Sequence, residues 1–126
     1  FQDSKGYIWF CTDGGGVSKF DGSKHQYFDK SKGLAGNVVR DVIEDHKGNL
    51  WFATDEGVSF FDGISFNNIG LDQGLNSEII ISIFQDAKQR VWVGTSGGGV
   101  SIIEKKDSLV VKNFTTGDQE NLKFKT

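Results

Sequence analysis

The side chains that could carry out chemistry are few and scattered along the chain. The 126 residues include 2 histidines and 1 cysteine. Cys11 stands alone, which excludes an internal disulfide and a Cys-x-x-Cys site. His25 and His46 show neither the His-x-Glu nor the His-x-x-x-His spacing typical of zinc sites. The sequence therefore predicts no metal and no cofactor.

Catalytic arrangements are equally weak. A serine nucleophile would need a motif such as Gly-x-Ser-x-Gly, which the chain does not contain. Glycosidase chemistry needs two carboxylates held about 5 to 9.5 Å apart. Candidate carboxylates are Glu44, Asp45, Glu78 and Asp86, but Asp45 and Asp86 recur in phase with a repeat, which favours a structural role. We therefore predict no catalytic residue and no enzyme, and we interpret Cys11 as a small core residue.

The glycine-rich turns could be taken for phosphate-binding loops, and the Asp-containing turns for calcium loops, but their sequence context favours neither. Gly14-Gly15-Gly16 and Gly97-Gly98-Gly99 precede Val-Ser segments of strand character, whereas phosphate loops need a helix behind them. The Asp-x-x-Gly turns lack the alternating oxygen ligands of a calcium loop. Both features indicate tight connections between strands.

Charge and hydropathy exclude several classes of partner. The net charge is −3 and the basic residues form no patch, so no nucleic-acid footprint is present. No run approaches the ~20 apolar residues of a membrane span, so we predict no membrane insertion by this segment. The chain begins with Phe1, from which we expect a piece of a longer protein or a processed form.

The elements that position these residues are set by an internal repeat. One sequence pattern occurs three times, and its aspartates are separated by 42 and then by 41 residues. The in-phase residues, predicted to be structural, are Asp3, Asp45 and Asp86, Trp9, Trp51 and Trp92, and Thr12, Thr54 and Thr95.

Short β-rich runs separated by Gly, Asn and Asp fill each repeat. In the middle repeat they cover Asn37–Glu44, Leu50–Thr54, Val58–Asp62 and Ser65–Ile69. Four short strands per forty-odd residues are typical of a propeller blade. The predicted fold class is all-β, with three four-stranded antiparallel blades at about 1–42, 43–83 and 84–126, forming a partial ring or a segment of a larger propeller.

The second strand of the middle repeat is apolar on both faces. Leu50, Phe52 and Thr54 point one way, and Trp51 and Ala53 point the other. Both faces must therefore be covered, which predicts that a blade is packed between two neighbours. The slot held by Cys11, Ala53 and Gly94 is always small, which indicates tight packing against the next blade.

The links between blades and the turns between second and third strands should share one face. That face would carry segments 30–36, 70–77 and 116–120, together with 13–16, 55–57 and 96–99. The candidate ligand contacts are polar residues that break the repeat, among them residues of the innermost strand, which is expected to face the central channel. Arg40 could clamp a carboxylate or sulfate, and Asn37, Asn76 and Glu78 could bind sugar hydroxyls. The alternative is that all four are solvated channel residues.

The pattern D-x-x-G-N-L-W-F-x-T-x-x-G-V-S-x-F-D-G over 45–63, followed by Gly74-Leu75, resembles the two-component regulator propeller repeat. The resemblance implies a large propeller in the extracytoplasmic, periplasmic sensor part of a bacterial hybrid two-component histidine kinase. It also implies that the ligand is a glycan fragment. The third repeat departs from the pattern, with Gln89-Arg90 for Gly-Asn and Gly117-Asp118 for Gly-Leu.

Three blades are fewer than the about four to eight of a closed propeller. Either the chain is a slice of a longer ring with further blades in cis, or copies associate, since 121–126 aligns with 37–42. The sequence favours the slice, because unpaired faces are a liability. For function, the first hypothesis is a non-catalytic sensor segment that binds a glycan or relays its binding to a kinase. A protein-interaction scaffold is the alternative, and a propeller lyase or hydrolase ranks last.

Overall fold

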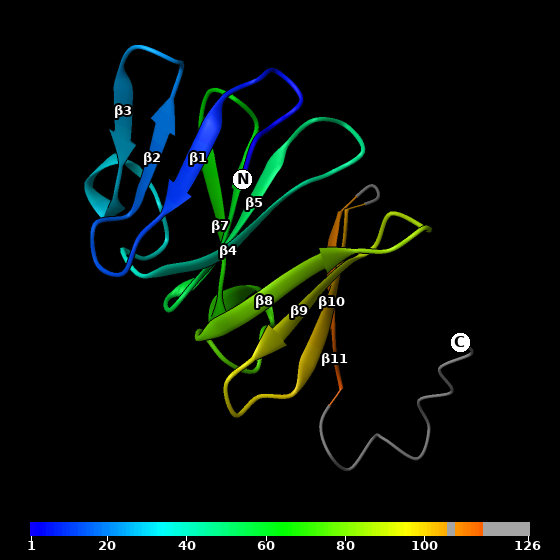
Figure 1. Ribbon diagram of the computed structural model, residues 1–126. Coiled ribbons are helices and arrows are strands. Elements are labelled where there is room, and N and C mark those ends of the chain that lie inside the picture. The colour runs from blue at the N-terminus through cyan, green and yellow to red at the C-terminus, as the bar shows by residue number, and fades with distance from the viewer. Residues whose placement is uncertain (106–107, 115–126) are drawn as a thin grey trace.

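The computed structural model describes residues 1–105 and 108–114. This part of the chain forms three antiparallel sheets that fan out side by side (Figure 1). It contains no α-helix, only two single-turn 3-10 helices, η1 (Lys30–Lys32) and η2 (Leu71–Gln73). No helix among these residues has the length and apolar character needed to cross a bilayer. The all-β fold class predicted from the repeat is confirmed.

The three sheets follow one another along the chain, and within each sheet the strands are neighbours in chain order. The first strands of the middle and third sheets, at 39–44 and 80–85, straddle the repeat bounds expected near 42 and 83. The first sheet holds β1 (Ile8–Cys11), β2 (Val17–Phe20) and β3 (His25–Phe28). The middle sheet holds β4 (Val39–Glu44), β5 (Leu50–Thr54), β6 (Gly57–Phe61) and β7 (Phe66–Ile69). The third sheet holds β8 (Ile80–Gln85), β9 (Val91–Thr95), β10 (Val100–Lys105) and β11 (Leu109–Phe114).

The strands expected in the middle repeat are confirmed to within two residues at each end. The first sheet differs from the expected four strands, because it has three. Gln2 pairs with Ile8 through an isolated bridge. That bridge is the counterpart of the Glu44–Leu50 pair that ends the first strand of the middle sheet.

The turns between first and second strands form for a local reason. The Oδ1 atom of Asp45 accepts the backbone N–H groups of Lys47 and Asn49, at 2.9 and 3.0 Å. Gly48 lies at φ +84°, a conformation that costs glycine little. The third sheet places Gln89 at φ 67° in the same position, so the Gly-Asn departure leaves the turn intact but puts a larger residue in the left-handed region.

The hydrophobic core consists of two layers, each sandwiched between neighbouring sheets. The layer between the first and middle sheets contains Trp9, Val17, Leu34, Val39, Val42, Leu50, Phe52 and Phe61. The layer between the middle and third sheets contains Trp51, Ala53, Val58, Phe60, Ile69, Leu75, Ile80, Ile83, Val91, Val93 and Ile103. The sheets are therefore held together by burial between blades.

The middle sheet shows the predicted covering of both faces. Every residue of β5 and β6 is buried. Phe52 packs into the layer toward the first sheet, whereas Trp51 packs into the layer toward the third. We call the side of each sheet that carries its tryptophan the Trp side, and the side that carries the next residue, Phe52 in the middle sheet, the Phe side.

The strand position held by Cys11, Ala53 and Gly94 carries a small residue in every sheet. Ala53 is fully buried in the layer facing the third sheet, as expected for packing against a neighbouring blade. At Gly94 a Cβ atom would also lie 2.6 Å from Oγ of Ser82 on the paired strand β8, so a contact within the third sheet adds a second reason for a small residue there.

A side-chain latch joins each blade to the loop of the preceding one. Asn68 of β7 donates from Nδ2 to the carbonyl of Gly33 at 2.8 Å, and its Oδ1 accepts from Ser59 Oγ at 2.8 Å. Asn113 of β11 makes the same pair of contacts with the carbonyl of Gly74 and with Ser101. Each latch fixes a Gly-Leu pair whose leucine, Leu34 or Leu75, lies buried between the sheets. We call this Ser–Asn pair the junction latch.

Candidate functional site

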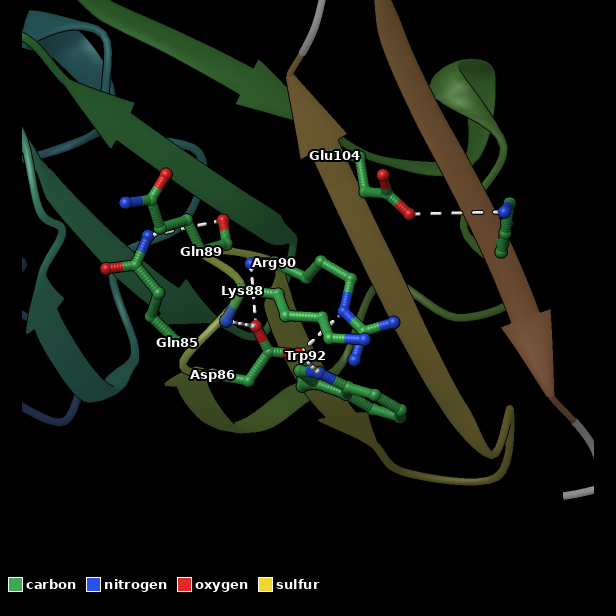
Figure 2. A network of polar contacts seen from close by, with 8 residues as sticks. Gln85, Asp86, Lys88, Gln89, Arg90, Trp92 and Glu104 are labelled. Atoms are coloured by element: carbon green, nitrogen blue, oxygen red, sulfur yellow. Dashed lines mark hydrogen bonds and ion pairs between the residues drawn. The ribbon is translucent and has the colours of Figure 1, made fainter. Parts of the chain in front are cut away.

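The in-phase aspartates and tryptophans form one repeated structural unit, which Figure 2 shows for Asp86. The indole Nε1 of each tryptophan donates to the Oδ2 of the aspartate six residues before it. The distances are 2.9 Å for Trp9 and Trp51 and 2.8 Å for Trp92. Because each aspartate also holds its turn through Oδ1, the unit ties the turn to the core.

Asp86 is the most strongly held of these carboxylates. Burial raises its pKa, but hydrogen bonds from the indole of Trp92 and from the backbone and guanidinium of Arg90 outweigh burial. The net effect lowers the pKa of Asp86 to about 2. Its Oδ2 also lies 2.7 Å from Nε of Arg90, which adds an ion pair (Figure 2).

The lowered pKa of Asp86 predicts an acid-dependent loss of stability. A carboxyl group with a lower pKa in the folded than in the unfolded state stabilises the fold at pH values above the unfolded value, and this contribution disappears as pH falls through the folded value. Asp86→Asn should lower the free energy of unfolding at pH 7 by about 2 kcal/mol and flatten its decline between about pH 4 and 2. Urea unfolding at a series of pH values measures both effects. An unchanged slope in that window would contradict the assignment.

The repeated threonines close the hairpin between second and third strands. The hydroxyls of Thr12, Thr54 and Thr95 each donate at 2.7 Å to the carbonyl of the glycine that ends the loop. Thr12 and Thr54 also accept a backbone N–H within that loop. These contacts use the hydroxyl within the turn, so the threonines act as structural residues.

The predicted loop face is formed by direct contacts between the hairpins and the links. The N–H of Gly16 donates to the carbonyl of Asn37 at 2.8 Å, and the N–H of Gly57 donates to the carbonyl of Glu78 at 2.7 Å. Within the third sheet, the N–H of Ser96 donates to the carbonyl of Ile79 at 2.9 Å, as the N–H of Asp55 does to the carbonyl of Val38 in the middle sheet. The expected contribution of 116–120 lies outside the described residues.

Two of the four candidate ligand residues lie around Lys30. The Oδ1 of Asn37 accepts the backbone N–H of Lys30 at 2.9 Å. The ammonium of Lys30 pairs with Oε1 of Glu56 at 2.7 Å. That hydrogen bond, with smaller contributions from the charges of Asp55 and Glu78, raises the pKa of Lys30. Asn37, Lys30 and Glu56 are thus joined by contacts that connect the link after the first sheet with a hairpin of the middle sheet, whereas Glu78 acts on Lys30 only through its charge.

A groove of about 370 Å³ opens on the same face. Its lining residues are Ala35, Glu56, Asn68, Ile69, Gly70, Leu71, Asp72, Gln73 and Glu78. The carboxylates of Glu56, Asp72 and Glu78 can accept hydrogen bonds from hydroxyl groups. Leu71 offers an exposed apolar contact beside them.

Arg40 and Asn76 are not lining residues of the groove. Arg40 stands at a bulge of β4, where the pairing register shifts between Val39 and Asp41. Its side chain is exposed, and among the described residues its guanidinium forms no hydrogen bond or ion pair. Asn76 is exposed and lies next to Gly98 in the loop face of the third sheet. The four predicted residues therefore do not form one compact site.

Sequence reasoning missed three residues that shape this region. Lys30 and Glu56 form the ion pair described above, and no repeat signal marks either of them. Asp41 accepts the N–H of Ile83 through Oδ2 at 3.0 Å, so it ties the inner strands β4 and β8 together. The available signal for Asp41 was its mismatch with Ser82 in the repeat alignment.

Neither metal binding nor thiol chemistry gains support from the geometry. Within 1–105 and 108–114, no group of three or more His, Cys, Asp or Glu side chains is placed to hold a metal ion. Cys11 is half-buried and packs against the layer between the first and middle sheets. Burial raises the pKa of its thiol to about 11, with the charge of Asp41 adding to the effect and the N-terminal charge opposing it. Cys11 is therefore a protonated core residue at neutral pH.

Comparison with known proteins extends these findings. Residues 33–56 and 74–97 each match the family model described as two component regulator propeller. No curated protein resembles the chain closely enough to count as a relative. Among solved structures, two of the extracellular domain of BT4673 from B. thetaiotaomicron match with 23% identity and a TM-score of 0.74. One of them assigns that domain to a one component system, and the other to a hybrid two component system.

A further match is the extracellular domain of BT3049 from B. thetaiotaomicron, a candidate hybrid two component system, with 18% identity and a TM-score of 0.64. Each match covers 94% of this chain. The chain spans only 19% of the length of the BT4673 domain and 23% of the BT3049 domain. At such identities the likeness shows the fold, which is that of propeller blades.

Proposed function

We propose that this chain, which carries repeats of the two component regulator propeller type, is a non-catalytic segment of a two-component sensor. In this role it binds a glycan fragment on its loop face or relays the binding of one by neighbouring blades to a histidine kinase. The family match and the fold support the sensor assignment. That the ligand is a glycan is a proposal that goes beyond the family match and the fold.

The groove on the loop face of the middle sheet carries the ligand part of the proposal. It combines carboxylates, amides and an exposed leucine, and loops on a rigid scaffold commonly bind ligands. Arg40 adds a guanidinium on strand β4 that has no partner among residues 1–105 and 108–114, and it could bind a uronate carboxylate or a sulfate in a bidentate manner. In this proposal Glu78 binds the hydroxyl groups of a saccharide, and Arg40 binds its anionic groups.

The same comparison supports a proposed placement outside the cytoplasm. The matching structures are extracellular domains. A sensor that detects a ligand from the surroundings binds it on the outer side of the membrane. The signal must then reach a kinase on the cytoplasmic side. The proposal therefore assigns this chain to the extracytoplasmic part of its sensor.

Thermal shift with a panel of neutral, uronate-containing and sulfated oligosaccharides tests the ligand. A ligand that binds the folded state raises the unfolding temperature by mass action. We expect a shift with an anionic glycan that Arg40→Ala abolishes and Arg40→Lys reduces. Glu78→Gln should weaken binding of neutral and anionic members alike. Lys47→Ala removes the same charge from an exposed turn outside the loop face and should leave every shift unchanged.

The panel also separates the competing functions. Equal shifts for the Arg40→Ala and wild-type chains would remove Arg40 from the site. Absence of any shift across the panel, in this chain and in the complete sensor, would favour a protein-interaction scaffold. Cleavage of any panel member would contradict the non-catalytic assignment.

A further inference from the structure

A second groove lies between the middle and third sheets, at the strand ends opposite to the loop face. It has a volume of about 110 Å³ and opens between the Trp side of the middle sheet and the Phe side of the third sheet. Its polar lining comes from the turns at 45–49 and 86–90, from Gln85 at the end of β8 and from Lys105 at the end of β10. Both walls belong to sheets of this chain. We call it the turn-face groove.

The equivalent groove between the first and middle sheets, of about 140 Å³, has a different charge arrangement. There Lys19 shares the lining with the carboxylates of Glu44 and Asp62. In the turn-face groove Gln85 stands in the place of Glu44, and no carboxylate among the described residues lines it in the place of Asp62. Lys105 again brings an ammonium group. The turn-face groove therefore keeps a positive charge and lacks the two carboxylates that accompany it in the other groove.

The ammonium of Lys105 has no charged partner in the groove. The one lining carboxylate, Asp45, uses Oδ1 to hold its turn and Oδ2 to accept the indole of Trp51 at 2.9 Å. Lys105 lies 3.5 Å from the centre of the Phe60 ring and forms no ion pair with another described residue. The pKa of Asp62, outside the groove, is lowered chiefly by backbone hydrogen bonds in its own turn, with a smaller contribution from the charge of Lys105.

Hydrogen bonds across the groove hold its donors in place. Oε1 of Gln85 accepts the backbone N–H of His46 at 3.0 Å, and Nε2 of Gln85 lies 3.2 Å from Nδ1 of the His46 ring. Because an amide nitrogen only donates, Nδ1 accepts and the neutral ring carries its hydrogen on Nε2. The same amide donates to the carbonyl of Gln89 at 3.3 Å (Figure 2). Gln89 keeps a φ of 67° where the other repeats have glycine, and such strain is typical of functional sites.

We propose that the turn-face groove binds one small oxyanion: a phosphate, a sulfate or the carboxylate of a small organic acid. The ammonium of Lys105 supplies the opposite charge, and the side-chain amide of Gln89 and Nε2 of His46 supply hydrogen-bond donors. The volume lies below the about 300 Å³ at which sites for drug-sized ligands begin, so a saccharide does not fit inside. The inference concerns another ligand on another face and does not depend on the proposed glycan site.

Titration of the ¹⁵N-labelled chain with sodium phosphate, sulfate or succinate, at an ionic strength held constant with chloride, tests the site by NMR. Saturable shifts should appear at the amides of the turn-face groove and not at those of the loop face. Lys105→Gln, at an exposed position, should weaken binding at least about tenfold. Lys88→Gln is the matched control, because Lys88 is an exposed lysine of the turn at 86–90 that does not line the groove, and it should bind like the wild type.

Gln85→Glu tests the charge argument from the other side, because it returns the carboxylate that Glu44 places in the equivalent groove. Glu44 accepts the backbone N–H of Ser4 at 2.8 Å, so a glutamate can keep the matching contact with His46 and the variant should stay folded. Binding of every anion should then be lost through repulsion.

The preference among the three anions identifies the ligand class. A response to succinate alone assigns the groove to carboxylates, and a response to phosphate or sulfate assigns it to tetrahedral anions. Absence of saturable shifts with all three anions would overturn the proposal. Unchanged affinity in Lys105→Gln and Gln85→Glu would overturn it as well, as would an equal loss of affinity in the Lys88→Gln control.

Discussion

Replacing Phe52 with alanine is expected to lower the free energy of unfolding by about 3–5 kcal/mol, whereas Phe10→Ala should cost about 1 kcal/mol. Both phenylalanines follow the tryptophan of their repeat and occupy the same strand slot. Phe52 lies fully buried between two sheets, but the surface around Phe10 is uncovered within one chain. The same truncation therefore leaves a cavity at one position only.

Urea denaturation at a concentration below that of chain association measures both values. A domain of this size is stable by about 5–15 kcal/mol. If Phe52→Ala leaves too little folded protein to fit, Phe52→Leu gives a smaller loss in the same direction. Equal losses for the two alanine variants would show that the sheets are stable without covering, which contradicts the account.

Gly16→Ala is expected to be the second severe change, at about 3–4 kcal/mol. Gly16 lies at φ +77°, and a Cβ atom there would come within 2.1 Å of the carbonyl oxygen of Phe28. The left-handed conformation costs a non-glycine residue about 1–2 kcal/mol, and the overlap adds about 1–3 kcal/mol of local displacement. The overlap is with backbone, so a side-chain rotation cannot relieve it.

Gly14→Ala in the same glycine cluster is the matched control. Gly14 also has a positive φ, +113°, but a Cβ atom there would meet nothing within 4 Å. It should therefore cost only the conformational part, about 1–2 kcal/mol. Thermal unfolding of the two variants gives the comparison. A Gly14→Ala loss as large as that of Gly16→Ala would contradict the role assigned to the close approach.

The fold was predictable because the same local causes recur three times. An in-phase Asp, Trp and Thr in each repeat indicated that the same turn, core contact and hairpin closure recur, and the alternation around Trp51 showed that both faces must be covered. These signals come from residues close together in the sequence, so one sequence is enough to reveal them. The strand ends of the middle repeat followed directly from its Gly, Asn and Asp residues.

The features that sequence reasoning missed depend on contacts between repeats. Asn68 belongs to a strand 35 residues from Gly33, and only the packed blades bring its amide to that carbonyl. The Lys30–Glu56 pair likewise joins two loops that lack any repeat signal. Arg40 was identified as a departure from the repeat, but its bulge could not be read from alternation alone. As a result, the four candidate ligand residues do not lie together: Glu78 lines the groove, whereas Arg40 and Asn76 do not.

Native-state hydrogen exchange of the backbone tests the central claim most directly, because the claim assigns stability to covering by neighbours. The middle sheet is covered on both faces, and the first sheet is covered on one. The account predicts that amides of β5 and β6 exchange slowest, near the rate of global unfolding, while β1 and β2 exchange faster through local opening. Protection of β1 and β2 equal to that of β5 and β6 in the monomer would contradict it.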